Sequence, residues 1–203
     1  MDKNIVDEKF EEWTRGSSPE ESLVRIFESI RNIPFAVVLE QITLEKGPVS
    51  MLEKNKGFCI PKHYLMGEML RRLKVPCRYC TFSFNWRDLN IEYPRELKNT
   101  AEILPVTYHL ACEINIDDIW VTVDATWDPG LKTKIPVVNE GWDGRTDTKL
   151  AVEPIDRFVH ENAEEREKFS LEKIGAYSLQ EELKLSRFSM AFNKWLEEVR
   201  GTG

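Results

Sequence analysis

The stretch that decides the fold runs from residue 57 to residue 79 and reads GFCIPKHYLMGEMLRRLKVPCRY. Apolar residues recur at helical spacing within it and predict a helix over about residues 60–73. Pro76 interrupts this pattern, and residues 77–85 then alternate as in a β-strand. The stretch therefore predicts a helix followed by a strand, with Cys59 at the N-terminal end of the helix.

Cys59 lies where a cysteine is readily activated. The positive end of a helix dipole and the free backbone N–H groups of the first turn favour a thiolate and lower the pKa of a thiol. The same N–H groups can stabilise an oxyanion formed when the sulfur attacks a carbonyl. The alternative is a buried cysteine that only packs at the start of a core helix.

A second candidate group lies on a predicted β-hairpin. Two strands are expected at about residues 106–114 and 119–125, joined by the polar turn 115–118. His109 lies on the first strand and Asp124 on the second. Paired in this way, the carboxylate could orient the imidazole and leave its other ring nitrogen for a thiol. The alternative is a solvated aspartate and an exposed histidine on a polar face.

The register of the hairpin decides how close the two residues lie. With the turn centred between Ile116 and Asp117, His109 directly faces Asp124, and their Cβ atoms are about 4.5–5.5 Å apart. Centring the turn on residues 117–118 instead makes Asp124 a diagonal neighbour on the same face. A three-residue loop would place Ala125 opposite His109 and break the pair.

These motifs together resemble the transglutaminase-like superfamily. Residues 57–79 are similar to its Gly-x-Cys motif, helix and apolar-Pro-x-Arg link, and HLACEINIDDIWVTVDAT, residues 109–126, is similar to its His and Asp motifs. The resemblance implies a papain-like α+β fold in which Cys59 is the nucleophile, His109 the general base and acid, and Asp124 the orienting carboxylate. It also implies acyl transfer or amide hydrolysis through an acyl-enzyme, since the superfamily includes transglutaminases, peptidases and peptide-N-glycanases.

Two further residues are candidates for the site. The resemblance calls for an oxyanion-hole side chain upstream of Cys59, and Gln41 is the candidate, with a surface glutamine as the alternative. Trp127 closely follows Asp124 and could line an acyl cleft or fill the core under a loop, as could Trp86 and Trp142. Because no calcium-loop pattern occurs, calcium control is not implied.

The flanks predict helices around this core. Ser18 and Glu21 form a capping-box pattern before an amphipathic helix, and helices are expected near residues 161–169 and 179–199. The remaining segments read as a turn at Gly47-Pro48, an irregular charged stretch at 86–103 and a long loop at 127–150. The order of helices, then strands, then helices predicts one α+β domain spanning residues 1–203.

The remaining histidines and cysteines have simpler interpretations. His63 lies one helical turn after Cys59 and could act as a second base or share a metal with it, but a structural zinc site needs further ligands. Cys77 and Cys80 have C-x-x-C spacing within a predicted strand, which favours packing over a redox or zinc role. Cys112 is expected in the core, and His160 is expected to be solvated or to cap a helix.

Composition limits the class of partner. The 203-residue chain is 41% hydrophobic with a formal net charge of −7 and no basic block, which disfavours nucleic acid and anionic membranes. No apolar run approaches the ~20 residues of a membrane span, and the first ten residues lack a signal-peptide core. We therefore expect a cytoplasmic protein with free thiols and no cofactor or metal. Its substrate would be a peptide, a protein or an amide-containing small molecule; a binding module without activity is the alternative function.

Overall fold

The computed structural model describes residues 4–201 of the chain, and it is an α+β fold. A four-stranded antiparallel sheet has the order β3-β2-β1-β4. The helices are α1 Ile5–Thr14, α2 Pro19–Asn32, α3 Gly47–Lys54, α4 Cys59–Arg72, α5 Arg95–Ala101, α6 Ala163–Gly175 and α7 Leu179–Gly201. The strands are β1 Cys77–Phe84, β2 Thr107–Ile116, β3 Ile119–Val123 and β4 Asp156–His160, and short 3₁₀ turns lie at Leu39–Gln41, Trp86–Asp88 and Pro129–Leu131.

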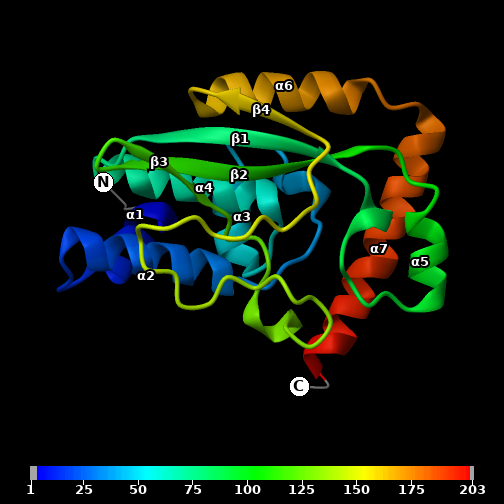
Figure 1. Ribbon diagram of the computed structural model, residues 1–203, viewed down its shortest axis with the longest axis horizontal. Helices are drawn as coiled ribbons and strands as arrows, with labels where there is room; N and C mark the ends of the chain where they lie inside the picture. Colours follow the sequence, from blue (N-terminus) through cyan, green and yellow to red (C-terminus); the bar gives the residue numbers. More distant parts are fainter. Residues whose placement is uncertain (1–3, 202–203) are drawn as a thin grey trace.

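The sheet lies between two groups of helices. Figure 1 shows α6 along one side of the sheet, α1 to α4 on the opposite side, and α5 and α7 at one end. Helix α4 packs directly against β1 and β2. It is buried along almost its whole length, including Leu65, Met66 and Met69, because apolar residues surround its axis rather than forming one stripe. The helix predicted over about residues 60–73 is thus α4, and it lies in the core.

The β2–β3 hairpin confirms the alternative register. Ile116 pairs with Ile119 and Cys112 with Val123, so the turn consists of Asp117 and Asp118 alone. Both turn residues have positive φ, 51° and 64°, as a type I′ hairpin turn requires. The directly opposed pairing of His109 with Asp124 is therefore wrong. The true register differs by two residues, and this keeps the two side chains on the same face.

Several local predictions are corrected. Gly47 and Pro48 begin helix α3 instead of forming a turn, because proline is favoured in the first turn of a helix. Part of the irregular stretch 86–103 forms helix α5. Strand β4 was not predicted, and His160 at its end is buried against Thr81, with 3.1 Å between its Nε2 and the threonine hydroxyl, instead of being solvated.

The helical flanks agree better with the sequence. Ser18 and Glu21 form the expected capping box at the start of α2. Helix α6 is longer than the predicted 161–169, and α7 begins at the predicted residue. No helix in the described range 4–201 is long and apolar enough to span a bilayer.

Candidate active site

Cys59 is the first residue of α4, and the backbone around it is closely packed. Gly57 forms a short parallel bridge with Phe35, and its carbonyl accepts the Ala36 N–H at 2.8 Å. A Cβ on Gly57 would lie 2.6 Å from Cγ of the buried Met51, so any larger residue there would displace the Met51 side chain. The N-cap Phe58 supplies no side-chain hydrogen bond. The N–H groups of the first turn consequently lack intrahelical acceptors and a capping side chain beside the Cys59 sulfur.

His109 and Asp124 lie next to each other despite the shifted register. Nε2 of His109 is 2.7 Å from Oδ2 of Asp124, and both side chains are buried. The carboxylate also accepts the Thr126 N–H at Oδ1, at 3.0 Å, and the Ala151 N–H at Oδ2, at 2.8 Å. Each of these backbone partners is a donor, which favours the ionised carboxylate.

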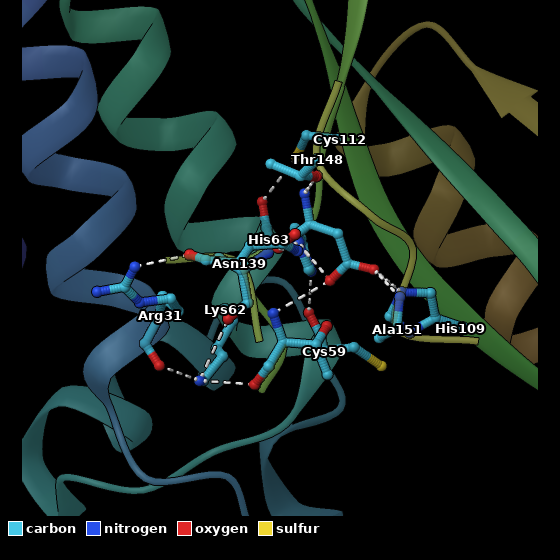
Figure 2. Close-up of polar contacts among 12 residues, drawn as sticks. Arg31, Cys59, Lys62, His63, His109, Cys112, Asn139, Thr148 and Ala151 are labelled. Atoms are coloured by element: carbon cyan, nitrogen blue, oxygen red, sulfur yellow. Dashed lines mark hydrogen bonds and ion pairs between the residues drawn. The ribbon is translucent and has the colours of Figure 1, made fainter. Parts of the chain in front are cut away.

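Cys59 lies beside the remaining ring nitrogen of His109. Figure 2 shows its sulfur on the side of the residue that faces the imidazole. Burial alone would raise the pKa of the Cys59 thiol, but the hydrogen bond and charge of His109 lower it below the ordinary value, with help from the Leu110 N–H and the charge of Arg166. The site therefore favours a thiolate.

The pKa values of His109 and Asp124 are also shifted in the directions that favour their charged forms. Burial alone would lower the pKa of His109, but the charge and hydrogen bond of Asp124, together with Cys59, raise it to about 10. Burial alone would raise the pKa of Asp124, but the charge of His109 and their hydrogen bond hold it well below its usual range. The three groups thus shift one another's pKa values toward the charged forms: thiolate, imidazolium and carboxylate.

His63 has a different environment from His109. Its Nδ1 is 2.8 Å from the carbonyl oxygen of Cys59, and its Nε2 accepts the Ala125 N–H at 3.1 Å. This pair of bonds requires the neutral tautomer with the proton on Nδ1. Burial lowers the pKa of His63 to about 4, in agreement with that tautomer. Both nitrogens are engaged, and residues 4–201 contain no cluster of three side chains suited to a metal.

Lys62, next to His63 on α4, is completely buried and joins three segments. Its ammonium group donates to the carbonyl oxygens of Arg31 (3.0 Å), Thr126 (2.9 Å) and Ala125 (3.3 Å), as Figure 2 shows in part. Three carbonyl acceptors match the three donors of an ammonium group. Lys62 thus fastens the end of α2 and the segment after Asp124 to the helix that carries Cys59.

The long loop after β3 holds the backbone of Asp124. The Asp124 N–H donates to the hydroxyl of Thr148 at 2.8 Å, and the Nδ2 group of Asn139 donates to the Asp124 carbonyl at 2.9 Å. The sequence predicts residues 127–150 only as a long loop and gives no indication of these contacts. Polar residues in a loop give no signal of which distant backbone group they bind.

A cavity of about 550 Å³ opens beside Cys59 and His109. Helix α7 and the end of α6 form one wall, and Trp86 and Trp127 form part of another. Trp142 does not reach the cavity: it packs on Phe27, with ring centroids 4.8 Å apart. Of the three loop tryptophans, two therefore line the candidate site.

The other candidate residues do not line this cavity. Gln41 is fully buried, which rules out the surface alternative, and its amide Nε2 donates to the Lys56 carbonyl at 2.9 Å. It is not among the residues lining the cavity, and its role as an oxyanion donor stays a prediction. Cys112 is fully buried and donates to the carbonyl of His63, while burial raises the pKa of the Cys80 thiol to about 12. Both are core thiols.

Comparison with known proteins shows the family of the chain. The model of the transglutaminase-like superfamily matches residues 10–125, more than half of the chain. A crystal structure from Cytophaga hutchinsonii, described as that of a candidate cysteine protease, is 14% identical and has a TM-score of 0.42. The alignment covers 78% of this chain and 46% of that protein, so the match spans less than half of that protein's length. No curated protein sequence is significantly similar to the chain.

Proposed function

Because the chain belongs to the transglutaminase-like superfamily, we propose that it is a thiol enzyme that transfers or hydrolyses acyl groups. Cys59 is the nucleophile, His109 the general acid and base, and Asp124 the carboxylate that orients the imidazole. The 2.7 Å contact between His109 and Asp124, beside a cysteine at a helix N-terminus, carries the proposal. It matches the chemical roles that a cysteine–histidine–carboxylate triad requires.

The reaction proceeds in two halves. The Cys59 thiolate attacks the substrate carbonyl, a carbon–sulfur bond forms, and backbone N–H groups at the start of α4 stabilise the oxyanion. His109 then gives its proton to the leaving amine or alcohol as the carbon–nitrogen or carbon–oxygen bond breaks. Water or a second amine, deprotonated by His109, attacks the acyl-enzyme and restores the thiolate and the imidazolium.

Lys62 and His63 act in this proposal as positioning residues. Lys62 binds the carbonyls of Ala125 and Thr126, and His63 binds the Ala125 N–H, so both fix the segment that follows Asp124 relative to α4. A rigid frame around the three reacting groups keeps them in the geometry of the transition state.

The test is thiol labelling across pH combined with turnover. Iodoacetamide should alkylate Cys59 well below pH 8, as located by mass spectrometry. Cys77, which is also partly exposed but lies on strand β1 rather than at a helix N-terminus, should be alkylated more slowly under the same conditions. Cys59→Ala should abolish hydrolysis of activated amides and esters, and Cys77→Ser should keep it. Ordinary reactivity of Cys59 together with no turnover by the wild type would favour the inactive binding module instead. Turnover that survives Cys59→Ala would reject Cys59 as the nucleophile.

A further inference from the structure

We propose that the cavity beside Cys59 selects substrates whose acyl part is a large apolar group, such as a medium-length hydrocarbon chain or an aromatic acid. This inference rests on the proposed function, because it names the substrate class of the same site. It does not extend to the identity of the leaving group or of the acceptor.

The composition of the cavity wall points to an apolar, uncharged ligand. Most lining residues are aliphatic or aromatic, and in the described part of the chain neither lysine nor arginine contributes to the wall. Glu182 is its one carboxylate, and the Tyr177 hydroxyl already donates to the Val106 carbonyl at 2.7 Å. A negatively charged acyl group would find no free cation in this wall, because the His109 imidazolium is already paired with Asp124. An uncharged hydrocarbon would replace water on apolar surface.

The rim of the cavity leaves apolar side chains in water. Leu39, Leu179 and Leu183 line the cavity and are 59%, 72% and 49% exposed. Exposed leucines are common singly, but three around one opening form an apolar mouth that a hydrocarbon ligand would cover. The volume of about 550 Å³ lies within the range of pockets that hold small organic ligands.

In one wall of the cavity, the backbone groups of Phe35 and Val37 already have hydrogen-bond partners and are not available to a peptide. Asp128 accepts the Phe35 N–H at 2.8 Å and Arg200 donates to the Phe35 carbonyl at 2.8 Å. Asn193 of α7 binds both the N–H and the carbonyl of Val37, each at 2.8 Å. An extended peptide would need such main-chain partners, and its own polar groups would lose water in an apolar cavity without compensation. The wall therefore favours an acyl chain over a peptide.

The acyl side of the scissile bond is the part that fits this cavity. The acyl group stays attached to the Cys59 sulfur while the leaving group departs and the acceptor enters. Much of the wall comes from Trp127 and from helices α6 and α7, which lie after residue 125, where the family match ends. This segment lies outside the family match, so the wall is built largely from residues that the family model does not describe.

Turnover of 4-nitrophenyl acetate, butyrate, hexanoate and octanoate tests the inference, with Cys59→Ala as background. We expect kcat/KM to rise about fourfold per methylene, equivalent to about 0.8 kcal/mol, until the cavity is filled. Alkyl acetates that carry the same chains on the alcohol side should show no such rise. A flat acyl series, a dependence confined to the alcohol side, or faster turnover of peptide amides would overturn the proposal.

Binding to the inactive Cys59→Ala protein separates this inference from the proposed function. Calorimetry should show octanamide binding much more tightly than acetamide. Chain-dependent binding without turnover in the wild type would support the apolar site and reject the enzyme. Turnover without chain dependence in either assay would keep the enzyme and reject the apolar site, and absence of both binding and turnover would reject both.

A matched pair of variants on α7 locates the effect. Leu183 lines the cavity and Met190 does not, although both are exposed apolar residues of the same helix. Leu183→Gln should reduce the ratio of octanoate to acetate turnover severalfold, and Met190→Gln should leave it unchanged. Ser186→Phe, which adds a ring to the wall, should move the best chain length to a shorter ester. Equal effects of the two glutamine variants would contradict the assignment of the wall.

Discussion

Nε2 of His63 accepts the backbone N–H of Ala125 at 3.1 Å, one residue after Asp124. The same ring contacts the carbonyl of Cys59 through Nδ1. The neutral imidazole of His63 therefore joins the start of α4 to the segment just after β3. His63 and His109 both lie near Cys59, but they have different protonation states. His63 is neutral because it is buried between backbone groups, and His109 is charged because it faces Asp124.

The neutral state of His63 predicts an acid-dependent loss of stability. Its pKa is about 4 in the folded protein and about 6.5 when unfolded, so between these values only the unfolded chain binds the proton. The free energy of unfolding should fall by about 3 kcal/mol as pH drops from 6.5 to 4. His63→Gln should lack this part of the slope in urea unfolding, and identical slopes in both proteins would contradict the neutral assignment.

The charged state of His109 predicts the pH dependence of the reaction. The rate requires a thiolate, so kcat/KM should rise with pH through the lowered pKa of Cys59. The reaction also requires the His109 imidazolium to protonate the leaving group, so kcat/KM should fall above about pH 10. His109→Ala should move the alkylation profile of Cys59 toward about pH 8.5, the pKa of a free thiol. An unchanged profile in His109→Ala would reject His109 as the partner of Cys59.

Asp124→Asn should disturb the orientation of the His109 imidazole and lower the rate without unfolding the protein. An amide group would place a donor against the N–H groups of Thr126 or Ala151, or against the ring of His109, so one hydrogen bond must be lost. By analogy with the aspartate of serine protease triads, kcat should fall by about 10⁴. Asp147→Asn, which changes an exposed carboxylate bound to the Thr122 N–H, is the control. A loss below tenfold would make Asp124 a structural residue.

The sequence could predict that His109 and Asp124 share one face of the sheet. Side chains alternate along a strand, so a register error of two residues leaves each side chain on the same face. The true turn at Asp117 and Asp118 shifts the register by two residues from the first expectation, and this keeps both side chains on one face. The start of α4 at Cys59 was predictable because glycine before it and proline in its first turn mark a helix N-terminus. Local patterns thus placed Cys59 and His109 on the correct elements, whereas Asp124, predicted within the second strand, lies one residue beyond the end of β3.

The supporting contacts could not be predicted in the same way. Lys62 and Arg166 occupy fully buried positions, but charged residues in helical segments read as solvated. Asn139 and Thr148 bind Asp124 from a loop whose path no periodicity describes. Such contacts join residues far apart in the chain, and only the tertiary fold shows them.

Lys62→Met should weaken both the fold and the reaction. The variant keeps a long side chain but leaves the carbonyls of Arg31, Ala125 and Thr126 without their shared donor, at a cost of about 1–3 kcal/mol for a buried unpaired group. Because the segment after Asp124 loosens, the pKa of His109 should also fall, and the basic limb of the pH profile should move to lower pH. Lys168→Met, at an exposed position on α6, is the control for thermal unfolding and for the profile. A stability loss without a shift of the basic limb would limit Lys62 to a structural role.

The buried guanidinium of Arg166 is expected to lower the stability of the fold and to raise the reactivity of Cys59. Its guanidinium is fully buried on α6 and donates to the Tyr64 hydroxyl at 3.2 Å, while Nε and Nη2 have no partner among the described residues. Such unpaired donors cost free energy, yet the charge lowers the pKa of Cys59. Arg166→Met keeps the bulk and removes both effects. It should raise the free energy of unfolding by about 1–3 kcal/mol and slow alkylation of Cys59 at pH 6, because less thiolate is present. Arg187→Met, at an exposed position on α7, should change neither quantity. A destabilised Arg166→Met protein with unchanged alkylation would show that the guanidinium supports packing and not the thiolate.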